Sequence, residues 1–481
     1  MIYYRPEWTC GRYNCNHNVA IMYNLIEGTS FLFEEVSAFF IGEIMSYKRN
    51  TAIDTEDLSR CVKLEESIVN EFCENLCEEG LLSKHIFSDE DISQYRKHVV
   101  LNNKESKVGQ SVSNEGILSD AEFAYTEIVK NDNLCHAVIE LTYNCSANCI
   151  HCYNPKKMNM SGDELDLKDY VRIIDELYNL GCYKITLTGG DPFSKPSIWD
   201  IIQYIYDKGI ALDVFTNGII IESDIKRLIN YYPKSVSVSL YSGLVEDHEA
   251  ITRIRGSYQK TISSIEQLSS YGVPLIIKCC IMKPNVLSYD MVAHIAKRYN
   301  AMVQFEVSIM NSLDGGKIIG ADLSLSEAMM EIVLRDSRIP LYVGSENGYG
   351  EKIRSENDRP CNAGESGICI TPNGNVQFCV AFPCVLGNVR NDMILYILKQ
   401  SEELKKWKGT TLKDFEKCNK YEFCNYCVIC AGCNFVATGS PIQPSLNNCN
   451  LAKIRWSLAG KLKQGNDPLL GKSVVERLSE L

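Results

Sequence analysis

The sequence lacks any apolar run long enough to form a membrane-spanning helix. None of its hydrophobic stretches approaches the roughly 20 residues that cross a bilayer. The first residues, MIYYRPEWTC, lack the pattern of a secretory signal peptide. Internal repeats and low-complexity tracts are absent as well. These absences argue against a membrane protein, a secreted protein and a repeat array, and we expect a cytoplasmic protein with no membrane partner.

Basic residues are also fewer than acidic ones. Lys and Arg number 49 against 61 Asp and Glu, which gives a formal net charge of −12. A general nucleic-acid binder needs a basic face, so we expect no nucleic-acid partner. A DNA-binding redox sensor is disfavoured for the same reason. The remaining composition, 45% hydrophobic and 23% charged, is ordinary for a globular protein, and 481 residues suffice for two to four domains.

Cysteine is what the sequence has in abundance, with 22 residues. Disulfides are rare in the reducing cytoplasm, so this number indicates metal or redox chemistry. The cysteines are unevenly placed, because many lie between Cys361 and Cys449. A compact group also occurs much earlier, in LTYNCSANCIHCYNPKK.

Patterning divides the chain into five parts. Residues 1–95 contain a strand-like hairpin around a Glu-Gly turn and amphipathic helices, which predicts a winged-helix-like module. Residues 96–132 are polar and are predicted to be a linker. Residues 133–325 alternate between strand and helix patterns, residues 326–358 form a bridging region, and residues 359–481 hold turns, cysteines and a helical tail.

The middle part predicts an α/β fold with a parallel sheet. Its six strand-like runs are HAVIELT, YKITLTG, ALDVFTNG, SVSVSLYS, PLIIKCCIM and MVQFEVSIM. Helical segments join them, and parallel neighbours need such crossovers. Six units are too few for an eight-unit barrel, so we expect a partial (β/α)6 barrel or an open doubly wound sheet. In both, ligands bind at the carboxyl ends of the strands.

Cys145, Cys149 and Cys152 follow the first of these strands at C-x3-C-x2-C spacing. A structural zinc site normally completes four ligands, and a fully ligated [4Fe–4S] cluster also takes four thiolates. Three thiolates in one loop leave one iron open for a substrate or cofactor. A zinc loop with a distant fourth ligand is the alternative reading.

This loop resembles that of the radical S-adenosylmethionine (SAM) enzymes, with His151 before the last cysteine. The resemblance implies that SAM binds the open iron and yields a 5′-deoxyadenosyl radical on reduction. "TGGDP" resembles the family's GGEP motif, which implies that Gly189, Gly190 and Asp191 meet the methionine end of SAM. Asp191 stands where the family usually has Glu.

Two further cofactor contacts are implied by the same resemblance. Ser239 matches the fourth-strand serine expected to touch the ribose, and Arg253 lies one position from the family's arginine. The family commonly reads SxDG where this chain has Ser239-Leu240-Tyr241-Ser242, so the chain departs from the pattern here.

The later cysteines are similar to those of the SPASM domain, an iron–sulfur extension of many peptide-modifying radical enzymes. Gly374-x4-Cys379 and LGNV match its opening. The resemblance implies one or two auxiliary [4Fe–4S] clusters. Eight cysteines are the predicted ligands: Cys361, Cys379, Cys418, Cys424, Cys427, Cys430, Cys433 and Cys449. Their spacing departs from the family's, and Cys418-x5-Cys424-x2-Cys427 is one of two possible cluster cores. Cys369 and Cys384 are expected to be buried structural thiols.

The N-terminal part looks similar to the peptide-recognition domain of ribosomal-peptide modification systems, which binds a leader segment through an edge strand. We therefore predict an oxidoreductase-type maturase of a ribosomally made precursor peptide, reduced by a ferredoxin or flavodoxin. A Cys thioether cross-link is the leading product, and carbon–carbon cross-linking and epimerisation are alternatives. A sulfatase-maturating enzyme has the same motifs but needs no N-terminal module.

Overall fold

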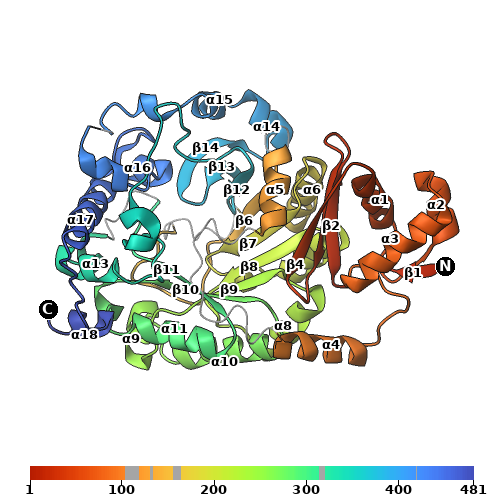
Figure 1. Cartoon of the computed structure of the whole chain (residues 1–481), viewed down its shortest axis with the longest axis horizontal. Coiled ribbons are helices and arrows are strands. Elements are labelled where there is room, and N and C mark those ends of the chain that lie inside the picture. Colours follow the sequence, from red (N-terminus) through yellow and green to blue (C-terminus); the bar gives the residue numbers. More distant parts are fainter. Residues whose placement is uncertain (103–118, 130–133, 155–163, 314–319, 419) are drawn as a thin grey trace.

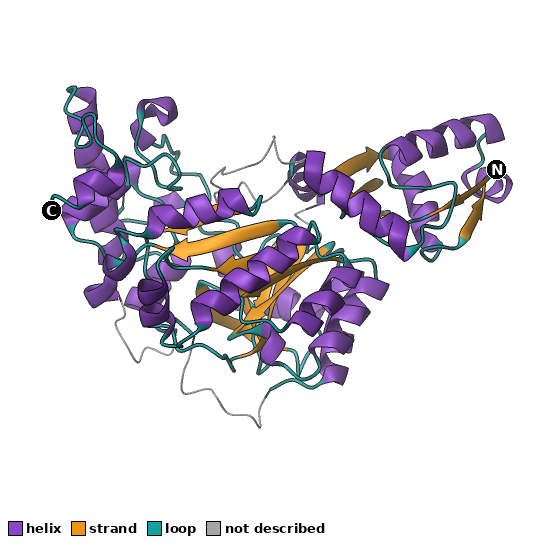
Figure 2. Cartoon of the chain, turned by 90° about the horizontal axis from the view of Figure 1, so that it is seen from below, coloured by secondary structure: helices purple, strands orange, loops and turns teal. Residues whose placement is uncertain are grey.

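The computed structural model describes residues 1–102, 119–129, 134–154, 164–313, 320–418 and 420–481. A mixed sheet of nine strands occupies the centre, helices cover it, and a smaller N-terminal lobe lies at one end (Figures 1 and 2). Within the described ranges, none of the helices combines the length and hydropathy that crossing a bilayer requires.

Six parallel strands in sequential order form the larger part of the central sheet, which confirms the predicted α/β fold. They are β6 (His136–Thr142), β7 (Lys184–Gly189), β8 (Ala211–Thr216), β9 (Ser235–Ser239), β10 (Leu275–Cys280) and β11 (Met302–Glu306). The described strands form an open sheet with β11 at its edge, as a partial barrel requires.

The crossovers between these strands are helical. They contain α6 (Leu167–Asn179), α7 (Ile198–Asp207), α8 (Glu222–Leu228), α9 (Val245–Thr252), α10 (Ser257–Ser270) and α11 (Tyr289–Arg298). In α6 the apolar residues Tyr170, Ile173, Ile174 and Leu177 are buried, and Asp166 and Asp169 form a capping box at its start. The helices bury the outward face of the sheet, so the polar residues of the other face remain available for a site.

The C-terminal part adds an antiparallel hairpin to the same sheet. Strand β12 (Gly367–Ile370) pairs parallel with β6 and antiparallel with β13 (Asn375–Cys379), which pairs with β14 (Phe382–Asn388). An Asn373-Gly374 turn, a pair that favours tight hairpins, joins β12 to β13, with Gly374 at φ +88°. The remaining helices are α12 (Gly320–Leu323), α13 (Glu327–Val333), α14 (Ile394–Gln400), α15 (Glu402–Lys408), α16 (Ala431–Thr438), α17 (Leu446–Lys463) and α18 (Val474–Leu478).

The N-terminal lobe has the elements of a winged-helix-like module. A three-stranded antiparallel sheet of order β2 (Thr9–Asn14), β3 (Val19–Asn24) and β4 (Thr29–Glu34) packs against helices. Its other elements are β1 (Ile2–Tyr4), β5 (Ala52–Asp54), α1 (Glu35–Ser46), α2 (Thr55–Val62) and α3 (Glu66–Glu78). The Glu-Gly turn between β3 and β4 is present, with Gly28 at φ +70°.

The segment predicted as a linker contains helical structure. Helix α4 (Asp89–Asn102) runs into it and α5 (Asp120–Val129) lies within it, while residues 103–118 and 130–132 of the predicted linker lie outside the described residues. Helix α5 is ordered because fully buried Glu122 pairs with Lys184 and Lys234, each at 3.3 Å, and accepts a hydrogen bond from Tyr23. This cluster of charges joins the N-terminal lobe to the amino ends of the central strands.

Candidate radical and iron–sulfur sites

The loop of Cys145, Cys149 and Cys152 leaves the carboxyl end of β6, as the sequence predicts. The backbone N–H of Asn148 donates to Thr252 O at 3.0 Å. The backbone N–H of Ile150 donates to Ile251 O, also at 3.0 Å. The last turn of α9 therefore holds the loop. Cys145 is exposed, the other two thiols are half-buried, and no described cysteine is in a disulfide.

The two glycines after β7 lie directly against this loop. Gly189 has φ +127°, and the N–H of Gly190 donates to Thr142 O at 2.6 Å. A Cβ on Gly190 would lie 2.3 Å from Asn144 O. Only glycine permits this approach, so the motif brings its backbone to the start of the cysteine loop.

Asp191 connects this turn to the end of β8. Its Oδ2 accepts hydrogen bonds from the Thr216 hydroxyl at 2.8 Å and the Asn217 N–H at 2.9 Å, and its Oδ1 accepts from the Phe193 N–H at 3.1 Å. Asn217 in turn donates to the Cys145 sulfur at 3.5 Å. Asp191 is buried and accepts all of these hydrogen bonds, so its side chain positions Asn217 and the loop around it.

His151 and Ser239 meet at a residue that the sequence analysis did not select, Tyr241. The rings of His151 and Tyr241 pack edge to face at 4.6 Å. The Tyr241 hydroxyl hydrogen-bonds to Ser239 and to the thiol of Cys149. The departure from SxDG at this position was the signal in the sequence. Burial lowers the pKa of His151 to about 4, so the ring is neutral at physiological pH.

The side chain of Arg253 is exposed, unlike the other predicted cofactor contacts. Arg253 ends α9 in the left-handed region, at φ +59°. Its neighbour Thr252, through the backbone carbonyl, is the residue that touches the cysteine loop. The structure therefore brings the segment, and not the guanidinium group, to the site.

The inner face of the sheet beside the loop is polar. Lys278 lies 3.3 Å from the centre of the Phe215 ring, and burial lowers its pKa to about 8. Cys280 and Glu306 are cross-strand neighbours on β10 and β11. Burial raises the pKa of Cys280 to about 12, and electrostatic interactions with Glu306 and Cys149 add to the rise.

Four later cysteines form a first group, tetrad A: Cys361, Cys379, Cys430 and Cys433. Burial raises the pKa of Cys379 to about 11, and Cys430 and Cys361 add to the rise. The Cys433 N–H donates to the Cys430 sulfur at 3.4 Å. A Cβ on Gly432 would lie 2.1 Å from Ala381 O, so glycine allows the start of α16 to approach the β13–β14 turn.

The other four form a second group, tetrad B: Cys418, Cys424, Cys427 and Cys449. All four line one cavity of about 580 Å³. Arg354 donates to the carbonyls of the loop that carries Cys424 and Cys427, and buried Arg455 donates to three carbonyls around it. The structure thus favours the grouping with Cys418-x5-Cys424-x2-Cys427. Cys369 is fully buried and Cys384 is half-buried, and neither lies in a tetrad.

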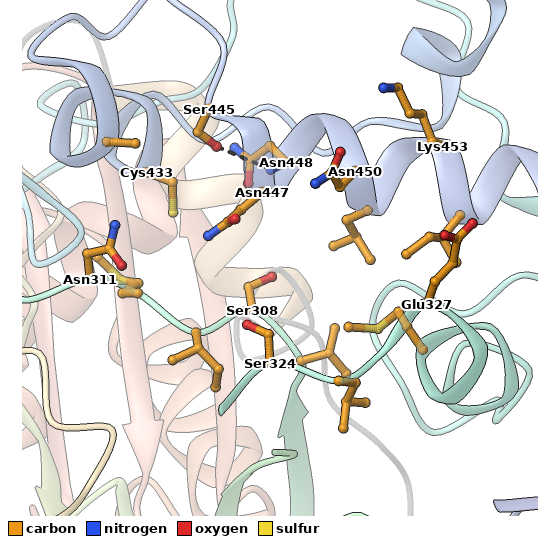
Figure 3. Close-up of a pocket in the computed structure, with 18 of the residues that line it drawn as sticks. Ser308, Asn311, Ser324, Glu327, Cys433, Ser445, Asn447, Asn448, Asn450 and Lys453 are labelled. Carbon is orange, nitrogen blue, oxygen red and sulfur yellow. Dashed lines mark hydrogen bonds between the residues drawn. The ribbon is translucent and has the colours of Figure 1, made fainter. Parts of the chain in front are cut away.

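A further cavity of about 380 Å³ lies between the segment after β11 and helices α16 and α17 (Figure 3). Hydroxyl and carboxamide groups dominate its labelled lining, with Glu327 and Lys453 as the charged groups. The thiol of Cys433 forms part of its wall, so the cavity adjoins tetrad A (Figure 3).

The residues present fit iron–sulfur clusters and SAM. Buried Nδ1 of His151 and Oδ1 of Asn154 have no hydrogen-bond partner among the described residues, as atoms that meet a bound group would. In the described part of the chain no three His, Cys, Asp or Glu side chains surround a single metal ion. A [4Fe–4S] cluster needs no such group, because each thiolate binds a different iron.

Comparison with known proteins agrees with this geometry. The family model of the radical SAM superfamily matches residues 139–298. An AdoMet-dependent heme synthase of Methanosarcina barkeri is 24% identical over 63% of this chain and 93% of its own length. The subtilosin biosynthesis protein AlbA of Bacillus subtilis is 26% identical over 66% of this chain and 71% of its own length. SuiB of Streptococcus suis, bound to the precursor peptide SuiA, superposes with a TM-score of 0.55 at 15% identity, over 93% of this chain and 99% of that one.

The chain therefore carries a radical SAM domain. The model of the SPASM iron–sulfur cluster-binding domain matches residues 361–433, so the chain also carries that second domain. Its cofactors follow: SAM with a [4Fe–4S] cluster at the radical site, and auxiliary iron–sulfur binding in the SPASM domain.

Proposed function

We propose that this enzyme modifies a ribosomally made precursor peptide, whose leader segment pairs with the free edge of β4. In the described chain, β3 is the only strand paired with β4, so its other edge offers unpaired backbone groups. Such an edge binds an extended peptide through main-chain hydrogen bonds. Phe33 of β4 packs against Phe72 of α3, which provides an apolar wall beside that edge. This edge is the observation that carries the proposal.

The relatives support a peptide as the substrate. SuiB resembles this chain over nearly its whole length, N-terminal lobe included, and was solved with a precursor peptide. AlbA is named for the biosynthesis of a bacteriocin. A sulfatase-maturating enzyme does not need the N-terminal lobe, so unchanged turnover after deletion of residues 1–95 would favour that alternative.

We further propose roles for the residues of the radical site. Cys145, Cys149 and Cys152 hold the catalytic cluster, the backbone of Gly189 to Asp191 meets the methionine end of SAM, and Ser239 meets its ribose. When bound, the cluster and SAM supply a 5′-deoxyadenosyl radical that abstracts hydrogen from an unactivated carbon. His151 Nδ1 faces the bound cofactor and Tyr241 orients Cys149. Arg253 acts through the backbone of its segment.

Tetrads A and B each hold one auxiliary cluster. Each offers four thiols, which is the number that a complete [4Fe–4S] cluster takes. A crowd of buried thiols without metal would be costly to ionise together, and bound iron neutralises them. The cavity of Figure 3 then holds the segment to be modified, with its carboxamides and hydroxyls bound to the peptide backbone.

The product we propose is a sulfur-to-carbon thioether. Its formation removes one hydrogen atom from a peptide carbon, taken by the deoxyadenosyl radical. The substrate thiol loses a proton, and one electron passes to an iron–sulfur centre. The thioether product is therefore two hydrogen atoms lighter than the precursor. Carbon–carbon cross-linking removes the same two hydrogen atoms but leaves cysteine thiols open to alkylation. Epimerisation leaves the mass unchanged. Mass spectrometry before and after alkylation therefore separates the three products.

The decisive test begins with anaerobic iron counting. Wild type is expected to bind about twelve irons per chain, and the Cys145/Cys149/Cys152→Ala variant about eight. Cys361/Cys379→Ala and Cys418/Cys449→Ala should each lose about four irons independently of the other. A shared loss would mean that the tetrads are grouped wrongly.

The second part of the test uses a precursor peptide encoded near this gene. Hydrogen exchange should show protection of residues 29–34 when the peptide binds, with α11 as the internal reference. Failure of the reduced enzyme to cleave SAM, or binding without protection of β4, would contradict the proposed function.

A further inference from the structure

Tetrad B lines a cavity that also carries exposed side chains, among them Lys417, Lys420 and Tyr421. Cys280 and Glu306 are cross-strand neighbours, and electrostatic interactions connect Cys280 with Cys149 and Glu306 with Cys430 and Cys433. These groups therefore lie within electrostatic range of one another, from the radical site to tetrad A. Three peptide units separate Cys427 from Cys430, so their Cα atoms are at most about 11 Å apart. Tetrad B therefore lies close to tetrad A, and exposed side chains line its cavity.

The surface around tetrad B is basic. Lys417, Lys420 and Lys453 line its cavity, and no carboxylate does. All three lysines are exposed, and none forms an ion pair with a described residue. Two exposed carboxylates, Glu416 and Glu422, flank Lys417 and Lys420 in the sequence but do not line the cavity. This local excess of positive charge contrasts with the net charge of −12.

Apolar side chains are exposed among these lysines. Tyr421 is 62% exposed and stacks on Phe423 at 5.1 Å, and Lys453 lies 5.4 Å from the centre of the Phe423 ring. On α17, Leu446, Cys449, Lys453 and Trp456 follow one another at steps of three and four residues, so they share a face. Leu446 is 79% exposed and Trp456 is 43% exposed.

We propose that this surface docks the protein that reduces the enzyme, a small acidic carrier of one electron. The lysines would attract and orient it, and the apolar groups would bind the area around its cofactor. The carrier is oxidised by one electron and the iron–sulfur centre at tetrad B is reduced by one, with no other atom transferred. This inference rests on the proposed function in one respect, that tetrad B holds a cluster.

The position of the surface fits this role. Helices α16 and α17 lie at the opposite end of the molecule from the N-terminal lobe (Figure 1). A carrier on tetrad B and a leader peptide on β4 would therefore not compete. The electron would then enter at tetrad B and not at the cysteine loop of the radical site.

A purified acidic flavodoxin serves as the probe for the test. Its affinity for the reconstituted full-length enzyme is measured by calorimetry at several salt concentrations, and reduction by its hydroquinone is followed by stopped flow. Lys417→Glu/Lys420→Glu/Lys453→Glu should lower the rate of reduction by about tenfold or more at low salt. The affinity should fall in parallel, and both effects should shrink as salt rises.

The matched control replaces three exposed lysines far from tetrad B. Lys97→Glu/Lys168→Glu/Lys297→Glu makes the same change in net charge on α4, α6 and α11 and should leave flavodoxin binding within about twofold of wild type. Photoreduced 5-deazariboflavin, a neutral reductant, should reduce both triple variants alike. Iron content is measured for each, and Lys→Gln substitutions replace Lys→Glu if the docking variant loses iron.

Three results would overturn the proposal. The control variant could weaken flavodoxin binding as much as the docking variant does. The docking variant could leave flavodoxin binding unchanged. The docking variant could also weaken binding of the precursor peptide and not that of flavodoxin. If iron counting finds no cluster at tetrad B, the proposed cluster assignment fails by itself, and the binding measurements still decide whether this surface recognises an acidic protein.

Discussion

Asp191 shows how one side chain can hold the edge of a radical site. Three donors from two segments converge on its carboxylate. Asp191→Ala leaves the buried Thr216 hydroxyl and two half-buried N–H groups without their acceptor, which should cost about 3 kcal/mol of stability and loosen Asn217 from Cys145. Thermal unfolding and the iron content of the radical site measure the two effects. Asp392→Ala, at an exposed position, is the control, and a loss no larger than the control's would contradict the role.

Glu140, buried on β6, makes stability depend on pH. Burial raises its pKa to about 7, from an ordinary value of 4.5, while Tyr143 donates to it at 3.0 Å. The folded chain holds this proton between those two values and the unfolded chain does not, so stability falls as pH rises. The loss between pH 6 and pH 8 should be about 1.3 kcal/mol.

Comparison with Glu140→Gln isolates this contribution. Glutamine keeps an acceptor for Tyr143 and removes the titration, so the variant should lose less stability than wild type over the same pH range. Apparent melting temperatures of both proteins at pH 6 and pH 8 give the difference. Parallel changes in the two proteins would show that Glu140 does not titrate in this range.

Site residues could be predicted from the sequence where they belong to a local motif. They could not be predicted where only the fold brings them to the site. Spacing alone identified the cysteine loop, because its thiols are local in sequence. Tyr241 and Asn217 act on Cys149 and Cys145 from the ends of other strands, and no local pattern reports that. The resemblance selected Arg253, whose side chain is exposed at the end of α9, and its contact with SAM stays a prediction.

At the scale of elements, Gly432 controls how α16 meets the β13–β14 turn. Gly432→Ala places a Cβ against the backbone of Ala381, which cannot move aside as a flexible side chain would. The start of α16 must then shift, and tetrad A should lose about four irons per chain. Gly460→Ala in α17 is the control, because nothing lies within 4 Å of its added Cβ. Equal iron contents in the two variants would argue against this packing role.

The parallel strands could be predicted from their pattern of apolar runs and helices, and the hairpin from its Asn-Gly turn. Two features could not. Helix α5 lies in a polar segment and is fixed by the pairing of Glu122 with distant lysines. The grouping of cysteines into tetrads depends on how α17 brings Cys449 to the Cys418–Cys427 loop, which spacing leaves open.

At the scale of the whole molecule, the buried charges at the lobe interface are the main liability. Burial alone would raise the pKa of Glu122, but Lys184 and Lys234 together lower it, so the carboxylate stays ionised. Glu122→Ala removes the ion-pair partner of buried Lys184 and one of the partners of half-buried Lys234, and should cost about 3–5 kcal/mol. Tyr23→Phe removes only one hydrogen bond and should cost about 1 kcal/mol. Thermal unfolding of both variants tests this ranking, and the reverse order would contradict it.

The pairing of β12 with β6 has a consequence for synthesis on the ribosome. Strand β6 lies in the interior of the finished sheet, yet its partner on one side is made roughly 230 residues later, which takes about 10–45 s at ordinary translation rates. Throughout that time the strand leading to the cysteine loop has an open edge, the kind of edge that other nascent chains can pair with. The nascent chain therefore depends on protection from aggregation until its last quarter has emerged from the ribosome.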